Sequence, residues 1–409
     1  MNGLSLPKSK IDVLLLEGIH NSAKRAFEQA GYTNVEVLSG ALTGQALVDR
    51  LQNVHILGIR SRTELTSAVL RQCPKLITVG CFCIGTNQVD IAAAEAFGIP
   101  VFNAPFSNTR SVAELVLAEM ILLLRRIPEK NSLLHQGTWQ KSADASFEAR
   151  GKILGIIGYG HIGSQLSVLA EALGMKVIFH DIEHKLPLGN ASTSNSLTDL
   201  LQQSDVVSLH VPDTAQTRNM ISTVQLKQMR PAAILINASR GQVVDIDALA
   251  ASLKQGYLAG AAIDVFPIEP SSNQERFFSP LQQLPNVILT PHVGGSTVEA
   301  QINIGSEVAE KLIKYSDNGS TLSAVNFPQV SLPPHPGQHR FLHIHHNQPG
   351  VLRAINAIFS EASVNITGQY LQTTPNIGYV VMDIEQEHGL ALLPKLRQVP
   401  GTLRARVLF

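Results

Sequence analysis

Three polar residues stand directly after apolar, strand-like runs in the second half of the chain, and their types suit proton and hydride transfer. They are Arg240, Glu269 and His292. A histidine exchanges protons near neutral pH, and a carboxylate beside it raises its pKa and fixes its tautomer. An arginine presents a planar fork to a carboxylate and a neighbouring keto oxygen. The trio predicts catalysis on a 2-oxo or 2-hydroxy acid, with the histidine moving the proton of the substrate oxygen.

A glycine-rich loop earlier in the chain indicates the cofactor for such a reaction. The strand-like run 153–157 leads into Gly158-Tyr159-Gly160-His161-Ile162-Gly163. Glycines in this pattern allow a tight turn and a close approach of the backbone to a pyrophosphate at a helix N-terminus. Asp181 closes the next strand-like run, where an acidic residue binds the ribose hydroxyls of NAD and repels the 2′-phosphate of NADP. The loop therefore predicts an NAD-dependent oxidoreductase.

Alternating β-rich and helical stretches must position these residues. We expect an α/β fold in which a Rossmann-like NAD-binding domain, 109–295, is inserted into a flavodoxin-like substrate-binding domain. The two parts of that outer domain are 1–108 and 296–328, and both sheets should be doubly wound and parallel. A proline-containing linker, 329–338, then leads to 339–409. This last region has the β-α-β-β-α-β order of a small ferredoxin-like domain.

Composition argues against several other classes of function. The 409 residues carry zero formal net charge, which speaks against nucleic acid or a membrane surface as a partner. The stretch 112–124 is too short to span a membrane and contains two glutamates; we expect it to lie in a buried helix from Thr109 to about Arg126. With three cysteines and no signal pattern at the N-terminus, we expect a cytoplasmic protein.

Histidines crowd the start of the C-terminal region and raise the alternative of a metal site. They are His335, His339, His343, His345 and His346. No cysteine lies among them, and the alternation of a strand sends His346 to the face opposite His343 and His345. We therefore expect no metal.

Several motifs together resemble the D-3-phosphoglycerate dehydrogenases with a C-terminal ACT domain, a family of D-2-hydroxyacid dehydrogenases. The resemblance lies in the glycine loop, the trio, and the segments 59–63, 85–90, 103–114, 365–366 and 369–371. It implies oxidation of 3-phospho-D-glycerate (3-phosphoglycerate) to 3-phosphohydroxypyruvate with NAD, the first step of L-serine biosynthesis. It also implies a homotetramer that L-serine inhibits.

The resemblance also adds residues to three sites. The expected cofactor-binding residues are Gly158, Gly160, His161, Ile162, Gly163, Asp181, Ala238, Ser239, Arg240, Asp264, His292, Gly294 and Gly295. For the phosphorylated substrate, the resemblance implies Arg60, Ser61, Asn108 and Gln301 beside Arg240. Arg62 and Lys141 could add positive charge, although Lys141 lies in a polar stretch and could equally be a solvated surface residue. The expected L-serine-binding residues are His345, Asn347 and Asn365.

Three positions depart from the pattern of the family. Ser39 stands where some relatives have a lysine, Gln348 stands where arginine is usual, and Pro336-Gly337 replaces a Gly-Gly pair. These changes bear on the affinity for phosphate and for serine. Other readings stay open: a reductase of another 2-oxo acid, a side activity on 2-oxoglutarate, an NAD-sensing scaffold without catalysis, and an ACT domain used only for assembly.

Overall fold

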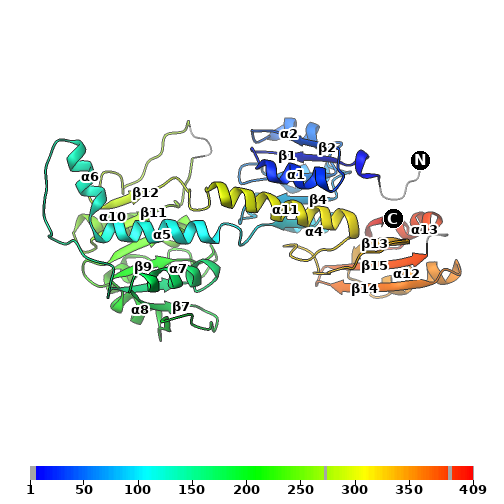
Figure 1. Ribbon diagram of the computed structural model, residues 1–409. Coiled ribbons are helices and arrows are strands. Elements are labelled where there is room, and N and C mark those ends of the chain that lie inside the picture. The colour runs from blue at the N-terminus through cyan, green and yellow to red at the C-terminus, as the bar shows by residue number, and fades with distance from the viewer. Residues whose placement is uncertain (1–5, 271–273, 386–388, 409) are drawn as a thin grey trace. The chain divides into compact units, whose positions relative to one another are not determined.

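The chain folds into two compact units. The computed structural model describes residues 6–270, 274–385 and 389–408. One unit combines residues 1–107 with 301–409, and the other comprises residues 108–300 (Figure 1). Within the described ranges, no helix is both long and apolar enough to cross a membrane.

The first unit contains a parallel five-stranded sheet in the order β2-β1-β3-β4-β5, the flavodoxin-like order. The strands are β1 (Asp12–Leu15), β2 (Asn34–Val37), β3 (Ile56–Ile59), β4 (Thr78–Cys81) and β5 (Val101–Asn103). The helices are η1 (Lys8–Lys10), α1 (Asn21–Gln29), α2 (Gly44–Leu51), α3 (Ser67–Arg71), α4 (Ile91–Ala96) and, from Gln301 onward, α11 (Val298–Asn318). Strands β3 and β4 are buried at every position, as expected for a parallel sheet covered on both faces.

The second unit is built on a parallel seven-stranded sheet in the order β12-β11-β10-β9-β6-β7-β8. The strands are β6 (Ile153–Ile157), β7 (Lys176–His180), β8 (Ser192–Thr193), β9 (Val206–Leu209), β10 (Ile234–Asn237), β11 (Gly260–Ile263) and β12 (Val287–Leu289). The helices are α5 (Thr109–Leu124), α6 (Ile127–His135), α7 (His161–Ala172), α8 (Leu197–Gln203), α9 (Thr223–Gln228), η2 (Gly241–Val243) and α10 (Ile246–Lys254). The sheet grows in opposite directions on the two sides of β6, so a ligand site is expected beyond the carboxyl ends of β6 and β9.

The C-terminal part of the first unit is an antiparallel sheet in the order β14-β15-β13-β16. Its elements are β13 (Gln338–His346), α12 (Val351–Glu361), β14 (Ile366–Thr373), β15 (Ile377–Glu385), α13 (Gly389–Arg397) and β16 (Thr402–Leu408). Helices α12 and α13 pack on one face (Figure 1). The other face contributes Leu342, Ile344 and Tyr379 to a core shared with β1 and α11. The predicted ferredoxin-like order is confirmed.

The segment expected to be a linker is packed onto the rest of the unit for part of its length. Val330 and Leu332 are buried, and their backbone N–H groups donate to the hydroxyls of Thr321 (3.1 Å) and Ser320 (3.0 Å). Up to residue 332 the segment is therefore part of the packed unit and does not act as a spacer between domains. Its apolar residues Val330 and Leu332 are buried, whereas their neighbours Gln329 and Ser331 are exposed.

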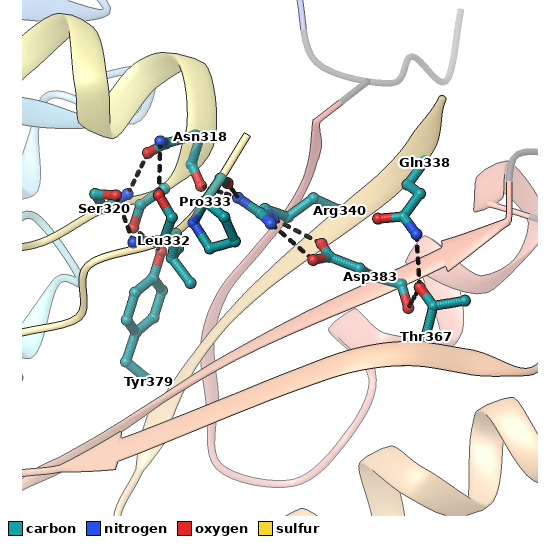
Figure 2. A network of polar contacts seen from close by, with 10 residues as sticks. Asn318, Ser320, Leu332, Pro333, Gln338, Arg340, Thr367, Tyr379 and Asp383 are labelled. Atoms are coloured by element: carbon teal, nitrogen blue, oxygen red, sulfur yellow. Dashed lines mark hydrogen bonds and ion pairs between the residues drawn. The ribbon is translucent and has the colours of Figure 1, made fainter. Parts of the chain in front are cut away.

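A buried ion pair fastens the C-terminal sheet to this segment. Arg340 donates through Nε (2.6 Å) and Nη2 (2.7 Å) to the two carboxylate oxygens of Asp383. Its Nη1 donates to the carbonyl oxygens of Asn318 (3.1 Å) and Pro333 (2.8 Å), at the end of α11 and in the packed segment. Figure 2 shows this network, in which the Tyr379 hydroxyl also donates to the carbonyl of Gly319 (2.6 Å). One guanidinium thus connects three parts of the unit.

Replacing Asp383 by asparagine should destabilise the C-terminal sheet. The Arg340 side chain is fully buried, and losing its carboxylate partner leaves a buried positive charge without compensation, at a cost of about 3–5 kcal/mol. We expect Asp383→Asn to lower the urea midpoint at which strands β13–β16 lose protection from hydrogen exchange. Glu36→Gln, which removes the half-exposed partner of Arg50, should change the stability of its own unit by less than about 1 kcal/mol. Equal effects of the two variants would contradict this account.

Candidate active site

The carboxylate of Asp264, at the end of β11, organises the loop that carries the candidate catalytic histidine. Asp264 is buried, and its Oδ1 accepts hydrogen bonds from the Thr290 hydroxyl (2.6 Å) and the Val293 N–H (2.8 Å). Its Oδ2 accepts from the Gly294 N–H (2.9 Å). The loop after β12 is thereby fastened to the end of the neighbouring strand. Asp264, expected only as a cofactor-binding residue, has this positioning contact as well.

The backbone of His292 adopts the left-handed conformation, with φ of 54°. For a residue with a side chain this costs on the order of 1–2 kcal/mol. The His292 N–H donates to the carbonyl oxygens of Asp264 (2.8 Å) and Thr290 (3.0 Å), and these bonds hold the turn. The turn leaves the imidazole half-exposed, with Nδ1 2.9 Å from Oε2 of Glu269.

Glu269 and His292 shift each other's protonation. The hydrogen bond with Glu269 raises the pKa of His292, and this outweighs the opposing effect of burial. Burial raises the pKa of the Glu269 carboxyl, but the hydrogen bonds from His292 and from the Phe266 N–H bring it below its ordinary value. The pair therefore favours a carboxylate beside an imidazolium. In that state Nδ1 is bound to Glu269, so Nε2 remains to exchange a proton with a substrate.

Arg240 is the third member of the predicted trio, and a buried asparagine shapes the turn that carries it. Asn237, the last residue of β10, accepts at Oδ1 from the N–H (3.1 Å) and the hydroxyl (2.8 Å) of Ser239. Its Nδ2 donates to the carbonyl oxygen of Arg240 (3.0 Å). The charge of Arg240 opposes the upward shift of the His292 pKa and helps to lower that of Glu269. The structure thus brings the predicted trio together within one unit.

The glycine loop after β6 has the shape that a pyrophosphate requires. Gly158 has φ of 91°, and a Cβ atom there would lie 2.3 Å from the carbonyl oxygen of His210. A Cβ on Gly163 would lie 2.3 Å from the carbonyl oxygen of Gly158, whereas one on Gly160 would meet nothing within 4 Å. The surrounding atoms therefore leave no room for a side chain at Gly158 or Gly163, whereas the space beside Gly160 is open. Helix α7 begins there, with His161 and Ile162. The loop therefore has the open space and the helix N-terminus that the pyrophosphate of NAD requires.

Asp181 lies beyond β7 and binds the glycine loop itself. Its Oδ2 accepts from the N–H of Tyr159 (2.8 Å), and its Oδ1 accepts from the N–H of Glu183 (2.9 Å). A carboxylate has further lone pairs for the ribose hydroxyls. The other expected cofactor-binding residues lie in loops at the same edge of the sheet: Ala238 and Ser239 after β10, and Gly294 and Gly295 after β12.

Arg60, Ser61 and Arg62 form a turn after β3 in the first unit, and Glu17 holds that turn. The Glu17 carboxylate accepts from the N–H groups of Arg60 (3.1 Å), Arg62 (3.0 Å) and Thr63 (2.9 Å). Glu17 itself has a left-handed backbone, with φ of 62°. Our sequence reasoning did not single out Glu17, although an acidic residue directly after an apolar strand is a usable signal.

The remaining substrate candidates lie on other elements. Gln301 is on α11 in the unit that contains Arg60, whereas Asn108 and Lys141 belong to the second unit. Asn108 precedes α5, and a Cβ atom on Gly295 would lie 2.3 Å from its Nδ2. Lys141 is exposed on the loop after α6.

The three expected serine-binding residues lie at ends of strands in the C-terminal sheet. His345 is buried near the end of β13, with Nδ1 3.3 Å from Nδ1 of His343. Burial lowers the pKa of His343 to about 4 and lowers that of His345, so both rings are neutral and the Nδ1–H of one donates to the Nδ1 of the other. Asn347 follows β13 and Asn365 precedes β14, and both are exposed.

The dinucleotide loop and the trio in one unit define an NAD-dependent dehydrogenase. A family model described as "D-isomer specific 2-hydroxyacid dehydrogenase, NAD binding domain" matches residues 117–294. A model described as "AHAS small subunit-like ACT domain" matches residues 341–404. A solved D-lactate dehydrogenase from Aquifex aeolicus, complexed with NAD and lactic acid, is similar with a TM-score of 0.64. It is 25% identical, and the match covers 73% of this chain and 93% of that one.

Two full-length relatives make the assignment more specific. The D-3-phosphoglycerate dehydrogenase of Haemophilus influenzae is 61% identical over 408 residues, and that of Escherichia coli K12 is 60% identical over 411 residues. Each match covers 100% of both chains. The chain belongs to the D-3-phosphoglycerate dehydrogenase family.

Replacing Glu269 by glutamine should move the pH profile of the reaction. The carboxylate raises the pKa of His292, so its loss lowers that pKa. Reduction of a 2-oxo acid requires the imidazolium form of His292. The rate of reduction is therefore highest below the His292 pKa and falls as pH rises through that pKa. We expect the reductive limb of kcat against pH to move to lower pH in Glu269→Gln, with NADH affinity unchanged. An unshifted limb would show that Glu269 does not set the protonation of His292.

Proposed function

We propose that the protein oxidises 3-phospho-D-glycerate to 3-phosphohydroxypyruvate with NAD, as the first step of L-serine biosynthesis. The observation that carries the proposal is the 2.9 Å contact between His292 and Glu269, with Arg240 close enough to influence the pKa of both. The full-length relatives bear the name of this activity. Because the carboxylate and the imidazole are in contact and a guanidinium lies close enough to affect the pKa of both, the arrangement supports catalysis rather than a scaffold without it.

In the proposed mechanism Arg240 binds the carboxylate of the substrate through its planar fork. The glycine loop and Asp181 would hold NAD, which would supply the acceptor for the hydride from C2 of the substrate. Nε2 of His292 takes the proton of the C2 hydroxyl, and the C–O bond becomes the keto group. Glu269 stabilises the imidazolium that forms. In the reverse direction the same imidazolium returns the proton to the keto oxygen.

The turn at Arg60–Arg62 is the candidate for the phosphate group of the substrate. Glu17 occupies the backbone N–H groups of Arg60 and Arg62, which fixes the turn while leaving the guanidinium groups to bind an anion. Because Arg240 recognises a feature shared by all 2-oxo acids, we also propose reduction of 2-oxoglutarate as a side activity. Selectivity for the phosphorylated substrate would then come from this turn.

We further propose that L-serine binds the C-terminal domain and inhibits the enzyme, which acts as a homotetramer in the cytoplasm. Support comes from the match to an ACT domain and from His345, Asn347 and Asn365 at the ends of its strands. Amide groups can accept from an ammonium and donate to a carboxylate, as an amino acid requires. A cytoplasmic location is consistent with the low cysteine content, three residues in 409.

Replacing His292 by alanine tests the proposed reaction directly. Loss of a positioned acid–base group should lower kcat roughly 10²–10⁴-fold, while NADH still binds because the glycine loop is untouched. The assay measures NADH formed from 3-phosphoglycerate and NADH consumed with 3-phosphohydroxypyruvate. A wild type that turns over neither substrate would refute the proposed function, and a fully active His292→Ala would refute the role of the histidine.

Replacing Arg60 by alanine should reduce kcat/KM more for 3-phosphohydroxypyruvate than for 2-oxoglutarate, because the latter has no phosphate. We expect a difference of at least tenfold, the loss of one charge-assisted contact. Arg71→Ala, which removes an exposed arginine from α3 of the same unit, should leave both values unchanged. Equal losses on the two substrates would remove Arg60 from the phosphate site.

A further inference from the structure

The turn between β14 and β15 holds Asn347 by two hydrogen bonds. The Asn347 backbone N–H donates to the carbonyl oxygen of Asn376 (2.9 Å). The Asn347 side-chain amide donates through Nδ2 to the carbonyl oxygen of Thr374 (2.9 Å). The second contact fixes the orientation of the amide, with its NH₂ end directed to the turn. The position of the turn therefore decides how Asn347 is presented to a ligand.

The same two residues of the turn bind a carboxylate from the substrate-binding part of the unit. Glu95, on α4, accepts at Oε1 from the Thr374 hydroxyl (3.1 Å) and at Oε2 from Nδ2 of Asn376 (3.0 Å). Glu95 is half-buried, so these charge-assisted bonds are partly protected from water. The Thr374 Oγ1 in turn accepts from the N–H groups of Asn376 (3.3 Å) and Ile377 (3.1 Å). Both oxygens of Glu95 are thus used to hold one short turn.

Hydrogen bonds near both ends of helix α4 connect it to β16 and to the turn that carries Arg60. At its C-terminal end, the carbonyl oxygen of Phe97 accepts from Nε of Arg404 (2.7 Å), a residue of β16. Before its N-terminal end, Gln88 donates through Nε2 to the carbonyl oxygen of Arg60 (2.5 Å). A displacement of α4 would therefore shift Gln88 and, through its hydrogen bond, the turn that carries Arg60.

We propose that Glu95 is a positioning residue of the amino-acid-binding site: it fixes the 374–376 turn that orients Asn347 and joins that turn to α4. The inference rests on the proposed binding of L-serine to the C-terminal domain. Serine that binds Asn347 also stabilises the turn, and through Glu95 it restrains α4 and the segment leading back to Arg60. Glu95 contacts neither of the proposed ligands and acts through the turn.

The first test is inhibition of the full-length enzyme by L-serine. Glu95→Ala should raise the serine concentration for half-inhibition about tenfold, since two charge-assisted hydrogen bonds that orient Asn347 are lost, with kcat and KM in serine-free buffer unchanged. Glu95→Gln keeps one acceptor oxygen and should give a smaller increase. Glu28→Ala, which removes an exposed glutamate of α1, is the matched control and should behave as wild type. Inhibition of Glu95→Ala at the wild-type serine concentration would overturn the proposal.

The second test measures hydrogen exchange in and after the 374–376 turn, first without serine. In Glu95→Ala the amides of Asn376 and Ile377 should exchange with deuterium faster than in wild type, and unchanged exchange would overturn the positioning role. In wild type, saturating serine should slow exchange in α4, and this protection should be lost in Glu95→Ala. A wild-type enzyme that neither binds nor is inhibited by serine would refute the proposed regulation and this inference with it. If serine inhibits wild type and Glu95→Ala equally, only the role of Glu95 is refuted.

Discussion

The carboxylate of Asp264 is the constraint on which the candidate active site depends. It accepts three hydrogen bonds from the loop that follows β12, and that loop contains a histidine in a left-handed conformation. The contact between His292 and Glu269 exists only while the loop keeps this shape. Burial, and then the charge of Asp264, raise the pKa of the nearby Glu119 carboxyl to about 8. Glu119 is therefore protonated at neutral pH, so the two buried acids do not repel each other as a pair of charges.

The same physical solution recurs at two other loops. Glu17 binds three backbone N–H groups of the turn that carries Arg60, and Asn237 binds the turn that carries Arg240. In each case a polar side chain at or just beyond the end of a buried strand satisfies backbone groups that have no partner in regular secondary structure. The loop becomes rigid, and its own side chains remain available for substrate or cofactor. Rigid placement of this kind supplies much of the orientation that catalysis needs.

The C-terminal domain is joined to the first unit by packing as well as by the chain. One face of its sheet shares a core with β1 and α11, and the Arg340–Asp383 pair is buried against the end of α11. A buried pair is strongly disrupted when one partner is lost. Glu95 contacts the 374–376 turn at the edge of this sheet. The domain that carries the turn is already held by its packing against β1 and α11. The proposed route from the C-terminal domain to α4 therefore runs through packed contacts of Glu95 and does not depend on the connecting segment.

The sequence by itself determined the order of the elements and predicted the chemistry of the candidate site, because both depend on local patterns. The glycine spacing, the apolar runs and the polar residues that follow them predicted the dinucleotide loop, the trio and the ferredoxin-like order. Helix α6 was not predicted, since none of its residues is buried and its apolar residues follow no clear helical face. The packed segment with Val330 and Leu332 was expected to be a linker because its prolines dominate the local pattern.

Only the tertiary structure decided which side chains hold the functional loops. Glu17 lies 43 residues from Arg60, and Glu95 lies 279 residues from Thr374. Contacts at such separations depend on how sheets and helices pack, and no periodicity or spacing in one sequence encodes them. The left-handed backbone of His292 is of the same kind: a residue that disfavours this conformation adopts it because Asp264 and Thr290, brought together by the sheet, bind the turn. Residue types set what the site can do, and long-range packing sets whether those residues meet.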